Sequence, residues 1–132
     1  MNYLLDTNVC VDLFKGHPKV CARLADLSPG DCAISSVTAY ELAVGVQRST
    51  QPEREKKKLG NLLATIEVVT FDQAAGIEAA RVRHQLEQAG IKIGPYDILI
   101  GGQALATKRI LISANTREFE RVPGLQVQNW RN

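Results

Sequence analysis

Short apolar runs alternate with longer amphipathic segments along the chain, a pattern typical of strands separated by helices. The first run is Tyr3–Leu5, and Cys32–Ile34, Val68–Thr70 and Ile110–Ile112 follow it. A weaker run at Leu125–Asn129 is a candidate for a final strand. Short apolar strands separated by helices indicate a mainly parallel sheet that helices cover on both faces. We therefore expect an α/β fold.

Start and stop signals delimit the helices between these strands. Pro18 suits a first helical turn, Gly90 suits a helix end, and Gly94-Pro95 breaks the chain before another helix. We predict six helices. The first ends at Lys15, the second spans 18–27, and the third runs from Ser36 past Val46. The others span 52–66, run from the Asp72 cap to Ala89, and span 98–107.

Four acidic residues lie far apart in the chain but at comparable places in this pattern. Asp6 directly follows the first strand, Glu41 and Asp97 lie near the starts of helices, and Glu118 follows the Ile110–Ile112 strand. Sites in parallel sheets lie outside the carboxyl ends of the strands, so all four can face one edge. Converging carboxylates repel one another, and a divalent cation relieves that repulsion.

Two-metal phosphodiester chemistry needs oxygen ligands that leave coordination positions open for water and substrate. In such a site Asp6 and Asp97 would bind the metal, and Glu41 and Glu118 would complete its shell. Short polar groups close by in the sequence could hydrogen-bond these ligands or the attacking water, namely Thr7, Asn8, Ser113 and Asn115.

Each carboxylate taken alone also has a structural interpretation. Asp6 and Asp97 could cap or complement a helix start, and Glu118 could be an ordinary first-turn residue. The other aspartates are interpreted as surface or capping residues, including Asp12, Asp26, Asp31 and Asp72. The joint placement of the four carboxylates is the stronger argument.

The net charge of +2 is too small to indicate nucleic-acid binding by itself. Arg117 and Arg121 flank Glu118, however, and are candidates for contacts with RNA phosphates beside the metal. The few aromatic residues form no stripe in the sequence for stacking bases. If the substrate is a nucleic acid, recognition of a folded molecule by its shape and phosphates is therefore the expectation.

The chain reads as one domain spanning residues 1–132. Cys10, Cys21 and Cys32 are odd in number and lack metal-site spacing, which favours a reducing compartment. No apolar run approaches the roughly 18 residues of a membrane span. A cytoplasmic protein without membrane contact is expected.

Other functions on an α/β fold compete with a metal-dependent nuclease. A phosphatase of the haloacid-dehalogenase kind needs a second aspartate two residues after the first, where this chain has Asn8. A receiver-like signalling domain needs paired acids after its first strand, and only Asp6 is present. The remaining alternative is a non-catalytic module that binds RNA or protein.

Four segments carry a resemblance to a known family, in order along the whole chain: LLDTNVCVDLFKG, ISSVTAYELAVGV, IGPYDILIGGQAL and ISANTREFERVPGLQVQNW. They resemble the PIN-domain ribonucleases and, more closely, the VapC-type toxins of bacterial toxin–antitoxin pairs. The resemblance implies a three-layer α/β/α sandwich and an endoribonuclease that uses Mg²⁺ or Mn²⁺. It assigns the metal ligands to Asp6, Glu41, Asp97 and Glu118. Many relatives have an aspartate where this chain has Asn115, so Glu118 is expected to supply the fourth charge.

The resemblance also implies partners. VapC-type toxins cut structured RNA such as tRNA, are held inactive by a cognate antitoxin, and usually form homodimers. The apolar residues of the first two helices are candidates for an antitoxin surface, although most of them are expected to be core.

Overall fold

The computed structural model describes residues 3–132, which form a five-stranded parallel sheet in the order β3-β2-β1-β4-β5. The strands are β1 (Tyr3–Leu5), β2 (Cys32–Ser35), β3 (Glu67–Val69), β4 (Ile110–Ile112) and β5 (Val127–Gln128). Every neighbouring pair is parallel. The predicted α/β class with a mainly parallel sheet is confirmed.

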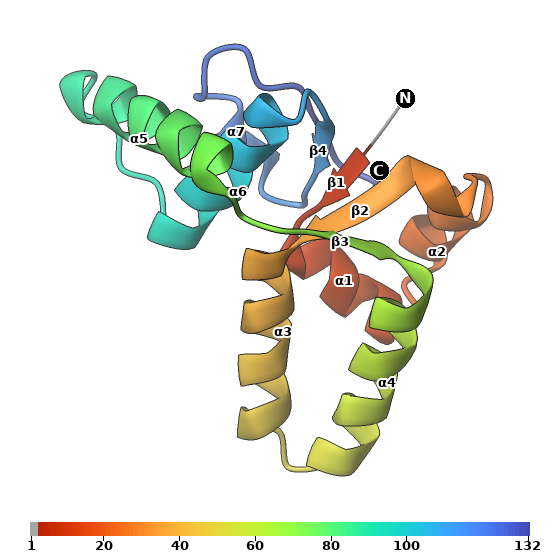
Figure 1. The fold of residues 1–132 in the computed structure, drawn as a ribbon. Coiled ribbons are helices and arrows are strands. Elements are labelled where there is room, and N and C mark those ends of the chain that lie inside the picture. The colour runs from red at the N-terminus through yellow and green to blue at the C-terminus, as the bar shows by residue number, and fades with distance from the viewer. Residues whose placement is uncertain (1–2) are drawn as a thin grey trace.

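Helices occupy the connections between strands. They are α1 (Thr7–Phe14), α2 (Pro18–Ala25), a 3-10 turn at Pro29–Asp31, α3 (Ser36–Arg48), α4 (Pro52–Thr65), α5 (Gln73–Gln88), α6 (Pro95–Ala106) and α7 (Thr116–Phe119). Figure 1 shows α1 to α4 on one side of the sheet and α5 to α7 on the other. The three layers of the predicted sandwich are thus present.

Alternation along the strands divides the core between the two faces. Leu5 and Ile112 point into a cluster with α1 to α4, whereas Leu4 and Leu111 point into a cluster with Ile100 and other residues of α6 and α7. Side chains on a strand alternate between faces, so one apolar run fills both clusters. This explains why the strands read as unbroken apolar segments.

The helix α5 packs closely against α6. A Cβ atom at Gly102 would lie 2.5 Å from the Cα atom of Ala79, so only glycine allows this approach of the two backbones. A third cluster, which includes Val82, Leu86 and Val122, is buried along the same contact. This packing fixes the start of α6, where Asp97 lies.

Several predicted boundaries shift by a few residues. β3 spans Glu67–Val69 rather than 68–70, β5 is shorter than 125–129, and α6 begins at Pro95 rather than Ile98. For the short helix α7 no bounds were predicted, although a first helical turn was considered at Glu118. Proline is favoured at a first helical position because it has no N–H to leave unpaired, which explains the earlier start of α6. No helix among the described residues is long and apolar enough to cross a membrane.

The interpretation of Asp12 as a surface or capping residue is wrong. Asp12 is only 6% exposed, and Arg131 donates hydrogen bonds of 2.7 and 2.8 Å to its two carboxylate oxygens. Trp130, itself buried, lies under the guanidinium group of Arg23. Arg131 lies 119 residues from Asp12 in the sequence, so the sequence around Asp12 does not indicate their ion pair.

Candidate metal centre

Asp6 lies at the carboxyl end of β1 and is the N-cap residue of α1. One carboxylate oxygen accepts a 2.8 Å hydrogen bond from the backbone N–H of Thr7. The other accepts hydrogen bonds from the Ser113 hydroxyl at 2.8 Å and from the Asn8 amide at 3.2 Å. The cap fixes the carboxylate at the edge of the sheet where parallel strands place their sites.

The environment of Asp6 resists its negative charge. The side chain is 3% exposed, and this burial raises the pKa of the Asp6 carboxyl, with a further contribution from the charge of Glu41. The hydrogen bonds from Ser113, Thr7 and Asn8 act in the opposite direction. A buried carboxylate without a cationic partner is costly, so a cation here would be strongly favoured.

Glu41 approaches the same place from α3. The Thr7 hydroxyl donates a 2.7 Å hydrogen bond to Glu41 Oε1, which links the first turn of α1 to α3. Thr7 therefore orients both acidic groups, by its backbone for Asp6 and by its side chain for Glu41. This is the function expected of a residue that supports metal ligands.

Asp97 and Glu118 are joined through one amide. Asn115 Nδ2 donates to Asp97 Oδ2 at 3.3 Å and to Glu118 Oε2 at 3.1 Å. The pKa of Asp97 is raised to about 6, chiefly by burial and then by the charges of Asp6, Glu118 and Glu41, while the Asn115 hydrogen bond acts in the opposite direction. Asp97 therefore lies within electrostatic range of the other three carboxylates.

Ser113 and Asn8 connect the two halves of the cluster. The Ser113 hydroxyl is fully buried, and it accepts hydrogen bonds from the Asn8 amide and from the backbone N–H of Asn115. Asn8 in turn accepts from the backbone N–H of Ala114 at 3.1 Å. The loop after β4 is thereby tied to the start of α1.

No ion pair among residues 3–132 joins Lys or Arg to any of the four carboxylates. Within that range, no three His, Cys, Asp or Glu side chains form a ready-made ligand set around one ion. Mg²⁺ retains several waters and needs only one or two carboxylates, so a looser arrangement still suits it. Carboxylate and amide oxygens are the donors that hard cations prefer, and this site fits such a cation.

The two basic candidates lie at the surface beside the cluster. Arg117 is in α7, next to Glu118, and Arg121 follows the helix; both side chains are exposed. Within residues 3–132, neither side chain donates a hydrogen bond or forms an ion pair. Both are available to a phosphate.

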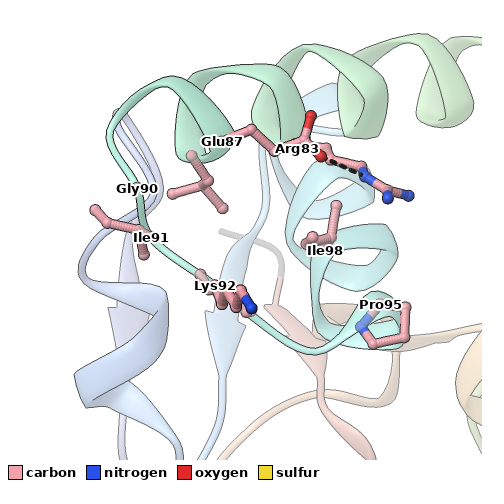
Figure 2. A pocket seen from close by; sticks show the side chains of 9 residues that line it. Arg83, Glu87, Gly90, Ile91, Lys92, Pro95 and Ile98 are labelled. Carbon is pink, nitrogen blue, oxygen red and sulfur yellow. Dashed lines mark hydrogen bonds and ion pairs between the residues drawn. The ribbon is translucent and has the colours of Figure 1, made fainter.

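Two hollows differ in their relation to the cluster. A groove of about 360 Å³ between α1, α3 and α4 is lined by Thr7 and Glu41 and has apolar walls that include Val11, Phe14 and Val46. A pocket of about 540 Å³ lies where α5 leads into α6, and its lining contains none of the four carboxylates (Figure 2). The smaller groove is the one that opens onto the site.

The sequence interpretation missed an aromatic pair at this site. Tyr40 precedes Glu41 and Tyr96 precedes Asp97, and the two hydroxyl oxygens lie 3.4 Å apart in the structure. The signal was a tyrosine directly before each of two predicted site residues. No aromatic stripe appears in the sequence because the partners are 56 residues apart.

Comparisons with known proteins agree on a family. Residues 3–125 match the model of the PIN domain. The chain is 36% identical over 130 residues to the tRNA(fMet)-specific endonuclease VapC of Shigella flexneri, with 98% of each chain covered. It is 36% identical over 132 residues to ribonuclease VapC2 of Rickettsia felis, again with 98% of each covered.

Solved structures are similar over the same length. The VapBC2 complex from Rickettsia felis, bound to a DNA fragment from its promoter, contains a chain with a TM-score of 0.93 and 36% identity, covering 98% of this chain and 99% of that one. The DNA-bound VapBC complex from Salmonella typhimurium gives a TM-score of 0.93 at 33% identity, with 98% of each chain covered.

Proposed function

Because the chain belongs to the PIN-domain family and, within it, to the VapC ribonucleases, we propose that it is a metal-dependent endoribonuclease toxin. The observation that carries the proposal is the convergence of Asp6, Glu41, Asp97 and Glu118 without a cationic side chain among them. A structural ion-pair network would include lysine or arginine. A set of repelling carboxylates is instead the expected form of a cation site.

Asp6 and Asp97 are the proposed ligands of Mg²⁺ or Mn²⁺, and Glu41 and Glu118 complete the shell directly or through water. A cation held by these residues would supply Lewis acidity at a phosphoryl oxygen and a water of lowered pKa as the nucleophile. The protein itself supplies the orientation of these carboxylates through Thr7, Ser113 and the bridging amide.

Asn115 has a distinct task in this proposal. The neutral amide of Asn115 donates a hydrogen bond to Asp97 and to Glu118. An aspartate at this position would instead add a fifth negative charge and repel both. Arg117 and Arg121 lie on the solvent side and are proposed to bind RNA phosphates on either side of the cut. Hydrolysis would leave a 5′-phosphate and a 3′-hydroxyl.

Structured RNA is the proposed substrate, and initiator tRNA is the first candidate because a relative is named for cutting tRNA(fMet). Free Cys10, Cys21 and Cys32 fit a reducing compartment, so we place the reaction in the cytoplasm.

An antitoxin is the proposed regulator, since similar chains occur in VapBC complexes. Of the apolar residues in the first two helices, Val9 and Val20 are buried in the core, whereas Val11 and Phe14 line the groove beside Glu41. An apolar segment of an antitoxin lying in this groove would cover the site. A homodimer is proposed as well, and the mass of the purified protein in solution tests it.

A substitution at Gly45 tests the groove. Gly45 lines it, and a Cβ added there meets no atom within 4 Å, so Gly45→Gln should fold normally and obstruct the groove. We expect weaker inhibition by the cognate antitoxin with unchanged RNA cleavage. Inhibition equal to that of the parent protein would place the antitoxin elsewhere.

A cleavage assay tests the proposed activity. Purified protein is incubated with total RNA and with initiator tRNA, in Mg²⁺, in Mn²⁺ and in EDTA, alongside an Asp97→Asn variant. Cleavage that needs the metal and is lost in the variant is expected. Metal-independent cleavage, or full activity of the variant, would contradict the proposal. Binding of RNA without any cleavage would favour the alternative of a non-catalytic module.

A further inference from the structure

Tyr40 and Tyr96 form an exposed aromatic pair that the core does not require. Their ring centroids are 5.8 Å apart with planes inclined at 58°, and the side chains are 53% and 42% exposed. The centroid separation is that of two rings in direct contact. Because the rings touch, nothing can insert between them, and the faces open to ligands are the outer ones.

Each tyrosine of the pair directly precedes a proposed metal ligand. Tyr40 comes from α3 beside Glu41, and Tyr96 comes from the first turn of α6 beside Asp97. The 3.4 Å approach of the two hydroxyl oxygens brings α3 and the start of α6 together at the residues that precede Glu41 and Asp97.

Single exposed tyrosines are common on protein surfaces and need no explanation. Two that come together from segments 56 residues apart, each next to a proposed metal ligand, form a prepared surface. The contact between the two rings restricts both side chains, which reduces the entropy lost when a flat ligand binds.

We propose that Tyr40 and Tyr96 form a stacking platform for an unpaired base of the RNA substrate adjacent to the scissile phosphate. This inference rests on the proposed function and adds a positioning element to it. A phosphate held at these carboxylates by a bound cation carries bases on its two neighbouring sugars, and each tyrosine directly precedes one of the residues proposed to hold that cation. Any base has an aromatic face, so stacking gives affinity with little sequence preference.

The platform also bears on the choice of substrate. Bases in a duplex are already stacked on one another, whereas bases in loops and bulges can be splayed onto aromatic side chains. An enzyme with such a platform should prefer a cut site in a loop of a folded RNA. Shape and phosphate contacts would then select the fold, and the tyrosines would select the unpaired position within it.

Variants at the two positions separate stacking from packing. Leucine keeps apolar bulk without an aromatic face, and phenylalanine keeps the ring without the hydroxyl. Affinity is measured by fluorescence anisotropy with Ca²⁺ in place of Mg²⁺, so that a cation still holds the phosphate at the carboxylates. A gel after each titration confirms that the RNA stays intact. The probe is a stem-loop that the parent enzyme cuts once. Tyr40→Leu or Tyr96→Leu should weaken binding about tenfold, and the phenylalanine variants should bind within about twofold of the parent.

Removing bases from the RNA identifies the stacked one. Each base flanking the cut is replaced in turn by an abasic ribose. At one position the loss of the base should weaken binding to the parent about tenfold. The leucine variant should bind the RNA with and without that base almost equally well. Equal losses in both proteins at every position would show that no base stacks there, and would overturn the inference.

Controls distinguish this inference from the activity on which it rests. Leu63→Ala removes exposed apolar area on α4 and should bind RNA like the parent.

In active proteins the leucine variants should raise KM more than they lower kcat. Cleavage by the parent with unaltered kinetics in the variants would reject the platform and keep the nuclease. No RNA cleavage by the parent would reject both. A change of oligomeric mass in the leucine variants would assign the pair to a protein interface instead.

Discussion

Two buried aspartates on one helix show opposite solutions to the same electrostatic problem. Asp6 caps α1 and is 3% exposed, whereas Asp12 lies within α1 and is 6% exposed. The hydrogen bonds and charge of Arg131 lower the pKa of Asp12 below its usual range. Burial and the charge of Glu41 raise the pKa of Asp6.

The difference separates a structural carboxylate from a candidate functional one. Asp12 forms a charge-assisted pair that attaches the end of the chain to α1, and the partner's charge compensates the loss of water. Asp6 accepts hydrogen bonds from neutral groups only, and the nearest charges are negative. Its negative charge remains for a ligand to neutralise.

The largest expected effect comes from making the same substitution at both positions. Asp6→Asn keeps an oxygen that can cap α1 but removes a proposed metal ligand, so RNA cleavage should fall by at least about a hundredfold. Asp12→Asn should leave cleavage within about twofold. Initial rates on one RNA at saturating Mn²⁺ provide the measurement. Similar losses in the two variants would show that Asp6 acts on stability and not on chemistry.

Stability should change in the reverse order. Asp12→Asn and Arg131→Gln each break the ion pair, and we expect a loss of about 1 to 2 kcal/mol. The value is moderate because the Arg131 side chain is 44% exposed and water screens the pair. Asp6→Asn should leave the metal-free protein as stable as the parent or more so. Urea unfolding in EDTA measures the free energy of unfolding of all three variants. A loss of stability in Asp6→Asn, together with unchanged stability in Asp12→Asn and Arg131→Gln, would contradict the account.

The pH dependence of stability distinguishes the two kinds of carboxylate. The pKa of Asp97 is about 6 in the folded protein and near its usual value of roughly 4 when unfolded, so the folded state binds more protons between them. Without metal, the parent should therefore lose about 1 to 3 kcal/mol relative to Asp97→Asn as the pH rises from 4 to 6. The Asp12 pair contributes above the usual carboxyl pKa and is lost as the pH falls below it. Urea titrations across this range would contradict the account if the parent and Asp97→Asn changed in parallel.

Of these substitutions, Asn115→Asp is expected to have the smallest effect, and it tests how much one more negative charge near Asp97 changes stability and metal affinity. The change replaces an amide that donates to Asp97 and Glu118 with another negative charge. The metal-free protein should become less stable, and Mn²⁺ should bind severalfold more tightly. Calorimetric titration with Mn²⁺ gives the affinity. Unchanged binding would place this residue outside the influence of the metal.

The fold could be predicted largely because each strand is an unbroken apolar run and each helix has clear end signals. The positions of Asp6, Glu41 and Asp97 followed from where those elements end. Boundaries at β3 and α6 differ from the prediction by one to three residues; at α6, Pro95 was interpreted as a break, although proline also suits a first helical position.

Contacts between distant segments could not be predicted. The ion pair of Asp12 with Arg131 and the contact of Tyr40 with Tyr96 join residues 119 and 56 positions apart, and no local pattern encodes them. The amide bridge of Asn115 was only partly foreseen. Its place beside the acidic set was expected, but its two simultaneous hydrogen bonds depend on how α7 turns and on where α6 begins, and neither boundary was predicted.

Direct titration of Mn²⁺ into the metal-free protein at pH 7.5 tests the central claim, that carboxylates without a cationic partner bind a divalent cation. The account predicts saturable binding in the parent and in Asp12→Asn, and none in Asp6→Asn or Asp97→Asn. A parent protein that shows no saturable binding, or an Asp97→Asn variant that binds as well as the parent, would contradict it.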